Sequence, residues 1–222
     1  MNLFFPLKSL PDQIYENLSE NILSGRLVGG ERLVETELCK QFSTSRAPIR
    51  ESFRRLESEG LVVIHPRKGT FVRKLSHDDI EEAFAVRMAL EGLAAYLAVP
   101  LLTNNDLQKM ADLISEMDLA IKKNDAQAFR EYDHKWHDSI IMASKNSILQ
   151  QTLQTLAKGV WLRISFTYYQ STAGFVTSNK MHKNILNSFK KREQDKARKL
   201  LEAHIEYAKG RILKLYDRIR ES

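Results

Sequence analysis

The sequence has almost no cysteine and no long hydrophobic run. Its single cysteine, Cys39, excludes a disulfide within the chain and favours a reducing compartment. No stretch approaches the roughly 20 consecutive apolar residues that a membrane-spanning helix needs. The first residues, MNLFFPLKSLPDQ, have a short apolar run broken by Pro6 and lack the basic leader of a signal peptide. We therefore expect a cytoplasmic protein with no membrane partner.

Glycine and proline are also scarce, with nine and five residues in 222, and both are rare after Ser76. Because these two residues interrupt helices, their scarcity permits long helices in the second part of the chain. The apolar periodicity there predicts helices over about 77–98, 104–123, 125–143, 146–169, 175–190 and 195–219. Long helices joined by short connections are typical of an antiparallel bundle.

The first 76 residues have a different pattern. Apolar residues recur at every third or fourth position in three segments, which predicts helices over 12–25, 34–42 and 45–59. Two short apolar stretches follow, at 61–66 and 69–74, and predict a β-hairpin. Three helices and then a hairpin is the order of a winged helix-turn-helix domain.

The predicted fold class is therefore mostly α, in two domains. Residues 1–76 form an N-terminal winged helix-turn-helix domain, and residues 77–222 form a C-terminal all-α antiparallel helical bundle. Charge differs along the chain: residues 46–74 carry eight basic and three acidic residues, 77–182 carry ten and thirteen, and 183–222 carry twelve and six. The net charge of +6 favours a polyanionic partner. Charge alone does not choose between the two basic regions, although the tail resembles an ordinary solvated face.

The segment STSRAPIRESFRRL predicts a helix with two different faces. Ser45 is the expected N-cap, and Pro48 then falls in the first turn, where a missing N–H costs little. At about 100° per residue, Ile49, Phe53 and Leu56 share one face, and Arg46, Arg50 and Arg54 share another. Arginine reads guanine edges or clamps phosphates, and the hairpin tip adds Arg67, Lys68 and Gly69 as a candidate wing. The alternative is an ordinary amphipathic helix with a charged flank.

Three histidines and an aspartate are spaced to converge in the bundle. Asp133 and His137 are four apart and share one helix face. His182 and His204 lie eleven residues before and after the expected turn between the last two helices, so an antiparallel hairpin makes them neighbours. These four side chains suit Zn, Ni, Mn or Co, with coordination positions left for a carboxylate ligand. The alternative is a set of scattered core or surface histidines. His134 faces about 100° away from its neighbour Asp133 and is not expected to be a ligand.

The stretch SGRLVGGERLVETELCKQFSTSRAPIRESFRRLESEGLVVIHPRKGTFV resembles the DNA-binding domain of the GntR family of bacterial transcription regulators. The resemblance implies DNA contacts by Ser45, Arg46 and Arg50, and by wing residues near Lys68 and Gly69. Many family members have arginine where this chain has Thr36, so one contact is expected to be weaker or absent.

Residues 80–215 resemble the FCD ligand-binding domain of the FadR-type branch of that family, in the segments VRMALEGLAAYLA, DHKWHDSI, HKNILNSF and AHI. The resemblance implies that a divalent metal is held by Asp133, His137, His182 and His204. It also places Arg87 near an effector cavity, where it would pair with a carboxylate. A structural pair with an acid of the bundle is the alternative role for Arg87, and Arg163 is a second candidate for effector binding.

Together these features predict a ligand-responsive transcription regulator. It would bind a double-stranded DNA operator as a homodimer, as a repressor released when a small carboxylate effector binds at the metal site. A metal-dependent enzyme acting on a small carboxylate is one alternative, because Asp/His sites also activate water. Against it, the sequence has no paired carboxylates and no nucleophile motif. Sequence-independent DNA binding driven by the basic tail is a further alternative.

Overall fold

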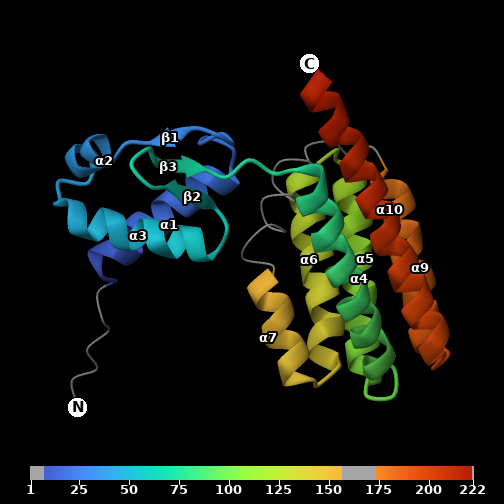
Figure 1. Cartoon of the computed structure of the whole chain (residues 1–222). Coiled ribbons are helices and arrows are strands. Elements are labelled where there is room, and N and C mark those ends of the chain that lie inside the picture. The colour runs from blue at the N-terminus through green and yellow to red at the C-terminus, as the bar shows by residue number, and fades with distance from the viewer. Residues whose placement is uncertain (1–7, 157–173, 222) are drawn as a thin grey trace, which may run out of the picture. The chain divides into compact units, whose positions relative to one another are not determined.

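A computed structural model of the protein describes residues 8–156 and 174–221 (Figure 1). These residues form two compact units, the first ending at Leu75 and the second beginning at Ser76. Within the described residues, the first unit contains three helices and a small sheet, and the second contains helices only. The predicted fold class is confirmed: a winged helix-turn-helix region is followed by a helical bundle.

The helices of the first unit lie where the apolar periodicity predicts them. They are α1 (Leu10–Leu23), α2 (Glu35–Gln41) and α3 (Arg46–Ser58). Ser9 caps α1, because its hydroxyl accepts a hydrogen bond from the backbone N–H of Asp12. Pro48 lies in the first turn of α3, where proline removes no intrahelical hydrogen bond. The proline therefore sets the start of this helix without breaking it.

A three-stranded antiparallel sheet completes the first unit. Its strands are β1 (Arg32–Leu33), β2 (Val62–His65) and β3 (Gly69–Val72), in the order β1-β3-β2. The β2–β3 hairpin is the predicted one, with Val63 opposite Phe71. Strand β1 was not predicted, because two residues are too few to show an alternating pattern.

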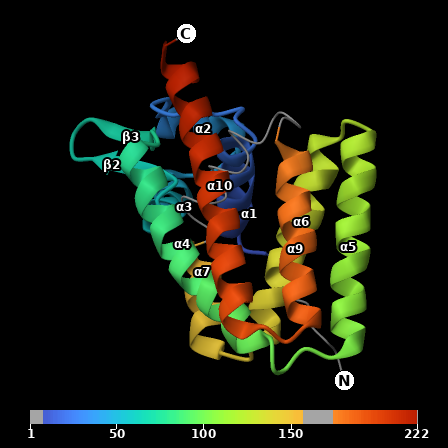
Figure 2. The ribbon, with the colours of Figure 1, turned by 90° about the vertical axis from the view of Figure 1, so that its right-hand side faces the viewer.

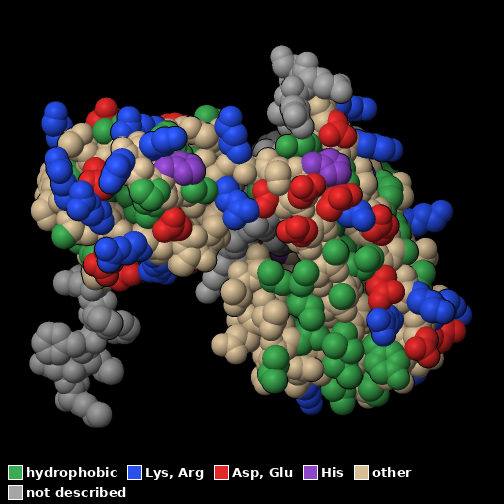
Figure 3. Space-filling model, in the orientation of Figure 1, with side chains coloured by type: hydrophobic (Ala, Val, Ile, Leu, Met, Phe, Trp, Pro, Cys, Tyr) green, Lys and Arg blue, Asp and Glu red, His purple; other side chains and the backbone are tan. Residues whose placement is uncertain are grey.

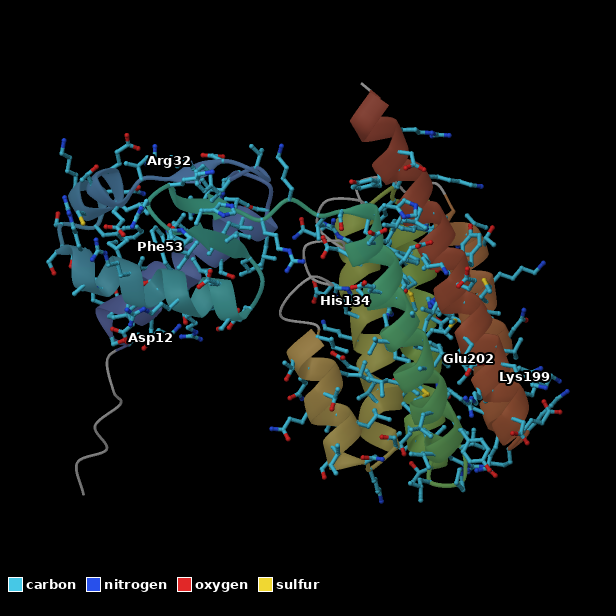
Figure 4. All side chains as sticks on the ribbon, viewed as in Figure 1. Asp12, Arg32, Phe53, His134, Lys199 and Glu202 are labelled. Carbon is cyan, nitrogen blue, oxygen red and sulfur yellow. The ribbon has the colours of Figure 1, made fainter. Side chains whose placement is uncertain are left out.

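Apolar side chains from all of these elements form the core of the first unit. Phe53 points from α3 into this core (Figure 4) and is 1% exposed. Ile49 and Leu56 are also fully buried, so the apolar face predicted for this helix is the face that packs. The other core residues are Ile14, Leu18, Ile22, Leu33, Leu38, Leu61, Val62 and Val72.

The second unit is built from long helices. They are α4 (His77–Ala98), α5 (Asn104–Lys122), α6 (Ala126–Ala143), α7 (Ser147–Leu156), α9 (Phe175–Lys190) and α10 (Gln194–Glu221). Each begins within one residue of its predicted start. The second part of the helix predicted over 146–169 lies outside the described residues.

Side-chain caps explain where the first two bundle helices begin. The Ser76 hydroxyl accepts a hydrogen bond from the backbone N–H of Asp79, and the Asp79 carboxylate accepts one from the backbone N–H of Ser76. Thr103 and Asp106 form the same reciprocal pair at the start of α5. Only residues 73–75 separate β3 from the N-cap of α4, so the bundle begins directly after the wing hairpin.

The bundle helices pack so that α4, α6, α9 and α10 meet around a common interior. Figures 1 and 2 show α10 lying between α4 and α9, and α4 also packs on α6. Helix α5 contacts α6 and α9. Phe129 and Phe175 stack in the interior with ring centroids 4.0 Å apart. Among residues 8–156 and 174–221, no helix is long and apolar enough to cross a membrane.

Candidate DNA-reading surface and metal centre

The exposed side of α3 carries the residues predicted to contact DNA. Arg46, Arg50 and Arg54 are all exposed, and they point away from the buried face of the helix. Ser45 is the N-cap by backbone conformation, but within the described part of the chain its side chain makes no capping hydrogen bond. An exposed hydroxyl beside a helix N-terminus is well placed to contact a phosphate.

Arg50 is held by an acid that the sequence analysis did not identify. Its Nε lies 3.0 and 3.2 Å from the two carboxylate oxygens of Glu35, and its Nη2 lies 3.1 Å from one of them. Glu35 is the first residue of α2, and it lies fifteen positions before Arg50 in the sequence. No local periodicity links the two residues, so only the packing of α2 on α3 reveals the pair. The ion pair fixes the direction of an otherwise exposed guanidinium.

This pair predicts that Glu35 serves sequence discrimination and not general DNA affinity. In Glu35→Gln the guanidinium loses its charged anchor, and a negative charge near the phosphates is removed. We expect binding to random DNA to stay equal or become tighter, while the ratio of operator to random affinity falls by roughly 5-fold, since exposed ion pairs are weak. Titration of the protein with operator DNA and with random DNA at one salt concentration measures both affinities and their ratio. Glu37→Gln on the same helix is the matched control, and an equal drop in that variant would contradict the role of Glu35.

The wing tip has a turn that only certain residues adopt. Lys68 donates its backbone N–H to the carbonyl of His65 at 3.1 Å, and Arg67 has a positive φ of 63°. Gly69 has φ 112°, and a Cβ there would lie 3.2 Å from the Nε of Arg32. Gly69 therefore acts through backbone conformation and space, whereas the side chains of Arg67 and Lys68 are exposed at the tip.

Arg32 is a basic residue of this surface that sequence reasoning missed. It lies on β1 opposite Phe71, and its guanidinium is 6.0 Å from the centroid of the Phe71 ring. Figure 3 shows Lys and Arg side chains spread over the first unit, and Figure 4 labels Arg32 among them. The signal that would have found Arg32 is β1 itself, which brings a residue from before α2 to the wing.

In the bundle, the structure brings the four predicted metal ligands together. Asp133 and His137 come from α6, His182 from α9 and His204 from α10, and all are at most 9% exposed. One ligand atom from each lies within 4.8 Å of the others. The Nε2 of His204 is 3.0 Å from the Nε2 of His182 and 3.2 Å from that of His137. The Nε2 of His182 is 3.3 Å from a carboxylate oxygen of Asp133.

The partners of two rings fix which nitrogen carries the proton. The Nδ1 of His137 lies 2.5 Å from a carboxylate oxygen of Glu91, which only accepts hydrogen bonds. The Nδ1 of His182 lies 3.4 Å from Oδ1 of Asn179, whose Nδ2 is already donating to Asp118 and to the carbonyl of Ile114. Both Nδ1 atoms are therefore the protonated ones. Both Nε2 atoms present lone pairs to the centre of the cluster.

These lone pairs make the cluster suitable for a cation. Burial lowers the pKa of His182 and of His204 well below the usual range, which keeps both rings neutral. The Nε2 lone pairs of His137 and His182 and the carboxylate of Asp133 then face one another, with too few protons between them to relieve their repulsion. Two nitrogens about 2.1 Å from one ion lie roughly 3.0 Å apart at a right angle and 3.4 Å apart in a tetrahedron. The observed 3.0, 3.2 and 3.3 Å separations fit a divalent metal ion.

The third ring has a different environment. The Nδ1 of His204 is buried and has no hydrogen-bond partner among the described residues.

His134 is half-buried and lies outside the four-residue cluster, in keeping with its predicted position. Burial lowers its pKa as well.

Arg87 points into the same polar interior and pairs with an acid of the bundle. Its Nε donates to a carboxylate oxygen of Glu91, and both side chains are buried. Burial alone would raise the pKa of Glu91, but the charge of Arg87 and the hydrogen bonds from Arg87 and His137 hold it well below its usual range. This pairing is the structural alternative that the sequence left open for Arg87. Arg163, the other candidate for effector binding, lies outside the described residues.

Comparison with known proteins places both units in one family. The sequence model of the family "bacterial regulatory proteins, gntR family" matches residues 10–72, and the sequence model of the FCD domain matches residues 82–207. Among characterised relatives, the HTH-type transcriptional repressor RspR of Escherichia coli K12 is 24% identical over 201 residues, covering 90% of this chain and 88% of the relative. The galactonate operon transcriptional repressor of the same organism is 28% identical over 209 residues, covering 84% and 89%.

Solved structures agree with these sequence matches. The fold is similar to that of E. coli McbR/YncC, with a TM-score of 0.72 and 23% identity, over 96% of this chain and 100% of the other. The gntR model describes bacterial regulatory proteins and both relatives are named as transcriptional repressors, so these matches indicate a regulator and not the metal-dependent enzyme considered as an alternative. It is a DNA-binding transcription regulator of the GntR family, with an FCD domain after its winged helix-turn-helix domain.

Proposed function

We propose that this regulator is a cytoplasmic repressor that binds its operator as a homodimer and is released by a small organic acid bound at a metal ion in the bundle. The observation that carries the proposal is the convergence of Asp133, His137, His182 and His204 in the interior of the unit that follows the wing. Both relatives described above are named as repressors, and one of these is the repressor of the galactonate operon, which is named for an organic acid.

The DNA-reading role belongs to residues 1–76 in this proposal. The helix N-terminus and Ser45 would contact a phosphate, and Arg46, Arg50 and Arg54 would enter the major groove and meet base edges or backbone. Arg67 and Lys68 would extend the contact at the wing, where Gly69 permits the turn. Residues 77–222 would bind the effector and form the dimer.

The metal would be held by the carboxylate of Asp133 and the Nε2 atoms of His137, His182 and His204. Zn, Ni, Mn and Co all accept this ligand set. A bound ion would supply a Lewis acid to which an effector carboxylate binds. Arg87 would pair with the same carboxylate, in exchange for its present contact with Glu91. Arg163 stays a second candidate for this role.

Exposed apolar side chains on the bundle support the homodimer. Val86 and Leu93 on α4, and Ile148 and Leu156 on α7, are all more than a third exposed. The two helices contact each other, and Figure 3 shows hydrophobic side chains gathered on a face of the bundle. Such a patch favours coverage by a second copy of the chain. Two copies would present two DNA-reading units to the two halves of a symmetric operator.

Selection of genomic DNA fragments on the purified full-length protein, followed by sequencing, tests the proposal. We expect enrichment of a short two-fold-symmetric site at about 150 mM salt, where sequence-independent binding is weak. Organic acids suggested by the neighbouring genes are then added, and release of the enriched site is measured with and without metal. An enriched site without symmetry would contradict the homodimer, and release that ignores the metal would contradict the effector site.

A further inference from the structure

Glu91 connects two buried groups of the bundle interior. It lies on α4, and its side chain is 5% exposed. One carboxylate oxygen accepts from Arg87, and the other lies 2.5 Å from the Nδ1 of His137 on α6. No local sequence pattern links Glu91 to His137, since the two residues are 46 positions apart. The carboxylate therefore has one oxygen for the arginine and one for the imidazole.

We propose that Glu91 is a positioning residue for the metal ligand His137, an inference that rests on the proposed metal site. By accepting from Nδ1, Glu91 selects the tautomer whose Nε2 lone pair faces His204 and His182. A carboxylate behind a ligating imidazole also makes the ring a better donor to a metal ion. Arg87 keeps the carboxylate in place by holding its other oxygen.

The charges of the interior explain why an acid stands behind this ring. Arg87, Glu91 and Asp133 together carry a net charge of −1 when the histidines are neutral. A divalent ion would change this to +1, whereas the same site without the Glu91 charge would reach +2. Because isolated charge is costly in a buried site, the Glu91 carboxylate should favour the metal-bound state.

The three imidazoles differ in what supports them. Only His137 has a charged acceptor at Nδ1, since His182 faces the neutral amide of Asn179 and the Nδ1 of His204 has no partner in the described residues. Support from Glu91 is therefore not a general property of the cluster. Loss of Glu91 should weaken the site through one defined ligand.

Glu91→Gln tests the inference. An amide has one acceptor oxygen, so glutamine cannot satisfy both Arg87 and His137 at similar side-chain size. We expect Zn²⁺ to bind 10- to 100-fold more weakly, the effect typical of losing a partner behind a metal ligand. Competition with a chromophoric chelator measures the affinity, and circular dichroism confirms the fold. Glu131→Gln is the matched control, because Glu131 is exposed on α6 and paired with Lys135, and its affinity should not change.

A second readout does not need the metal. In metal-free protein, ¹⁵N NMR of the His137 ring should show the proton on Nδ1, and Glu91→Gln should lose this preference. If Glu91→Gln fails to fold, Glu91→Asp replaces it in the test. Aspartate keeps the charge but has a shorter side chain that does not reach His137, so Zn²⁺ binding should again be weaker. Equal affinity and an unchanged tautomer in the folded variants would overturn the positioning role. If the wild type itself binds none of the four metals, the proposed metal site fails, and the tautomer alone then decides the role of Glu91.

Discussion

Adding a divalent metal to chelator-treated protein should raise the melting temperature of the bundle by roughly 10 °C. The ligands come from α6, α9 and α10, and positions 133 and 204 are brought together only by folding, so the ion binds the native state and not the unfolded chain. At about 1,000 times its Kd, such a ligand stabilises by about 4 kcal/mol. For a protein of this size, 1 kcal/mol corresponds to about 2–4 °C. Calorimetry with and without Zn²⁺, Ni²⁺, Mn²⁺ and Co²⁺ measures the shift.

His204→Ala should abolish this shift, because the Nε2 of His204 lies within 3.2 Å of both other imidazole nitrogens. The variant also starts from a lower melting temperature, since it leaves a cavity, so the comparison is the difference between metal and chelator within each protein. His65→Ala, which removes an exposed histidine of the wing, is the control and should keep the full shift. A full shift in His204→Ala, or none in the wild type with any of the four metals, would refute the metal site.

Replacing Arg50 by alanine should cost the largest loss of operator affinity. A single arginine contact to a base edge is worth on the order of 10- to 100-fold, and a homodimer makes the contact twice. The loss in Arg50→Ala should therefore reach on the order of 100- to 10,000-fold. It should also exceed the loss in Arg54→Ala, because the Glu35 carboxylate is then left unneutralised near the phosphates. Fluorescence anisotropy with the selected operator measures both variants.

The control for this series lies in the basic tail. Arg198 is on α10, paired with Glu202 at 2.8 Å, and Figure 4 shows the labelled neighbours Lys199 and Glu202 on that helix. Arg198→Ala removes the same charge from the second basic region and should leave operator affinity within about 2-fold, as expected for an exposed charge that is already paired with Glu202. If Arg198→Ala weakens operator binding and Arg50→Ala does not, the tail and not α3 is the DNA-contacting surface.

Periodicity and hairpin symmetry predicted the parts of this protein that depend on local sequence. The spacing of Ile49, Phe53 and Leu56 defines the packed face of α3, and the bundle helices begin at capped or strongly periodic positions. Equal distances from one turn placed His182 beside His204, and their Nε2 atoms lie 3.0 Å apart. In each case the geometry of one helix or one helical hairpin is sufficient.

Contacts between distant elements could not be predicted in the same way. Glu35 reaches Arg50 across two helices, and Glu91 reaches His137 across the bundle. Arg32 enters the wing through a strand of two residues. Each contact depends on how elements pack, and no periodic pattern of a single segment encodes it. Polar partners behind the functional side chains are thus the part of the site that needed the structure.

The partnerless Nδ1 of His204 has a consequence for how this protein would change under artificial selection. A buried ring nitrogen without a partner costs about 1–3 kcal/mol, with or without a proton on it, and an apolar side chain of similar size has no such cost. His204→Leu should therefore melt higher than the wild type in chelator, as thermal denaturation would show. A library selected only for heat resistance, without metal and without operator, should lose His204 early. If histidine persists at position 204 through many rounds of this selection, the buried imidazole does not destabilise the metal-free protein.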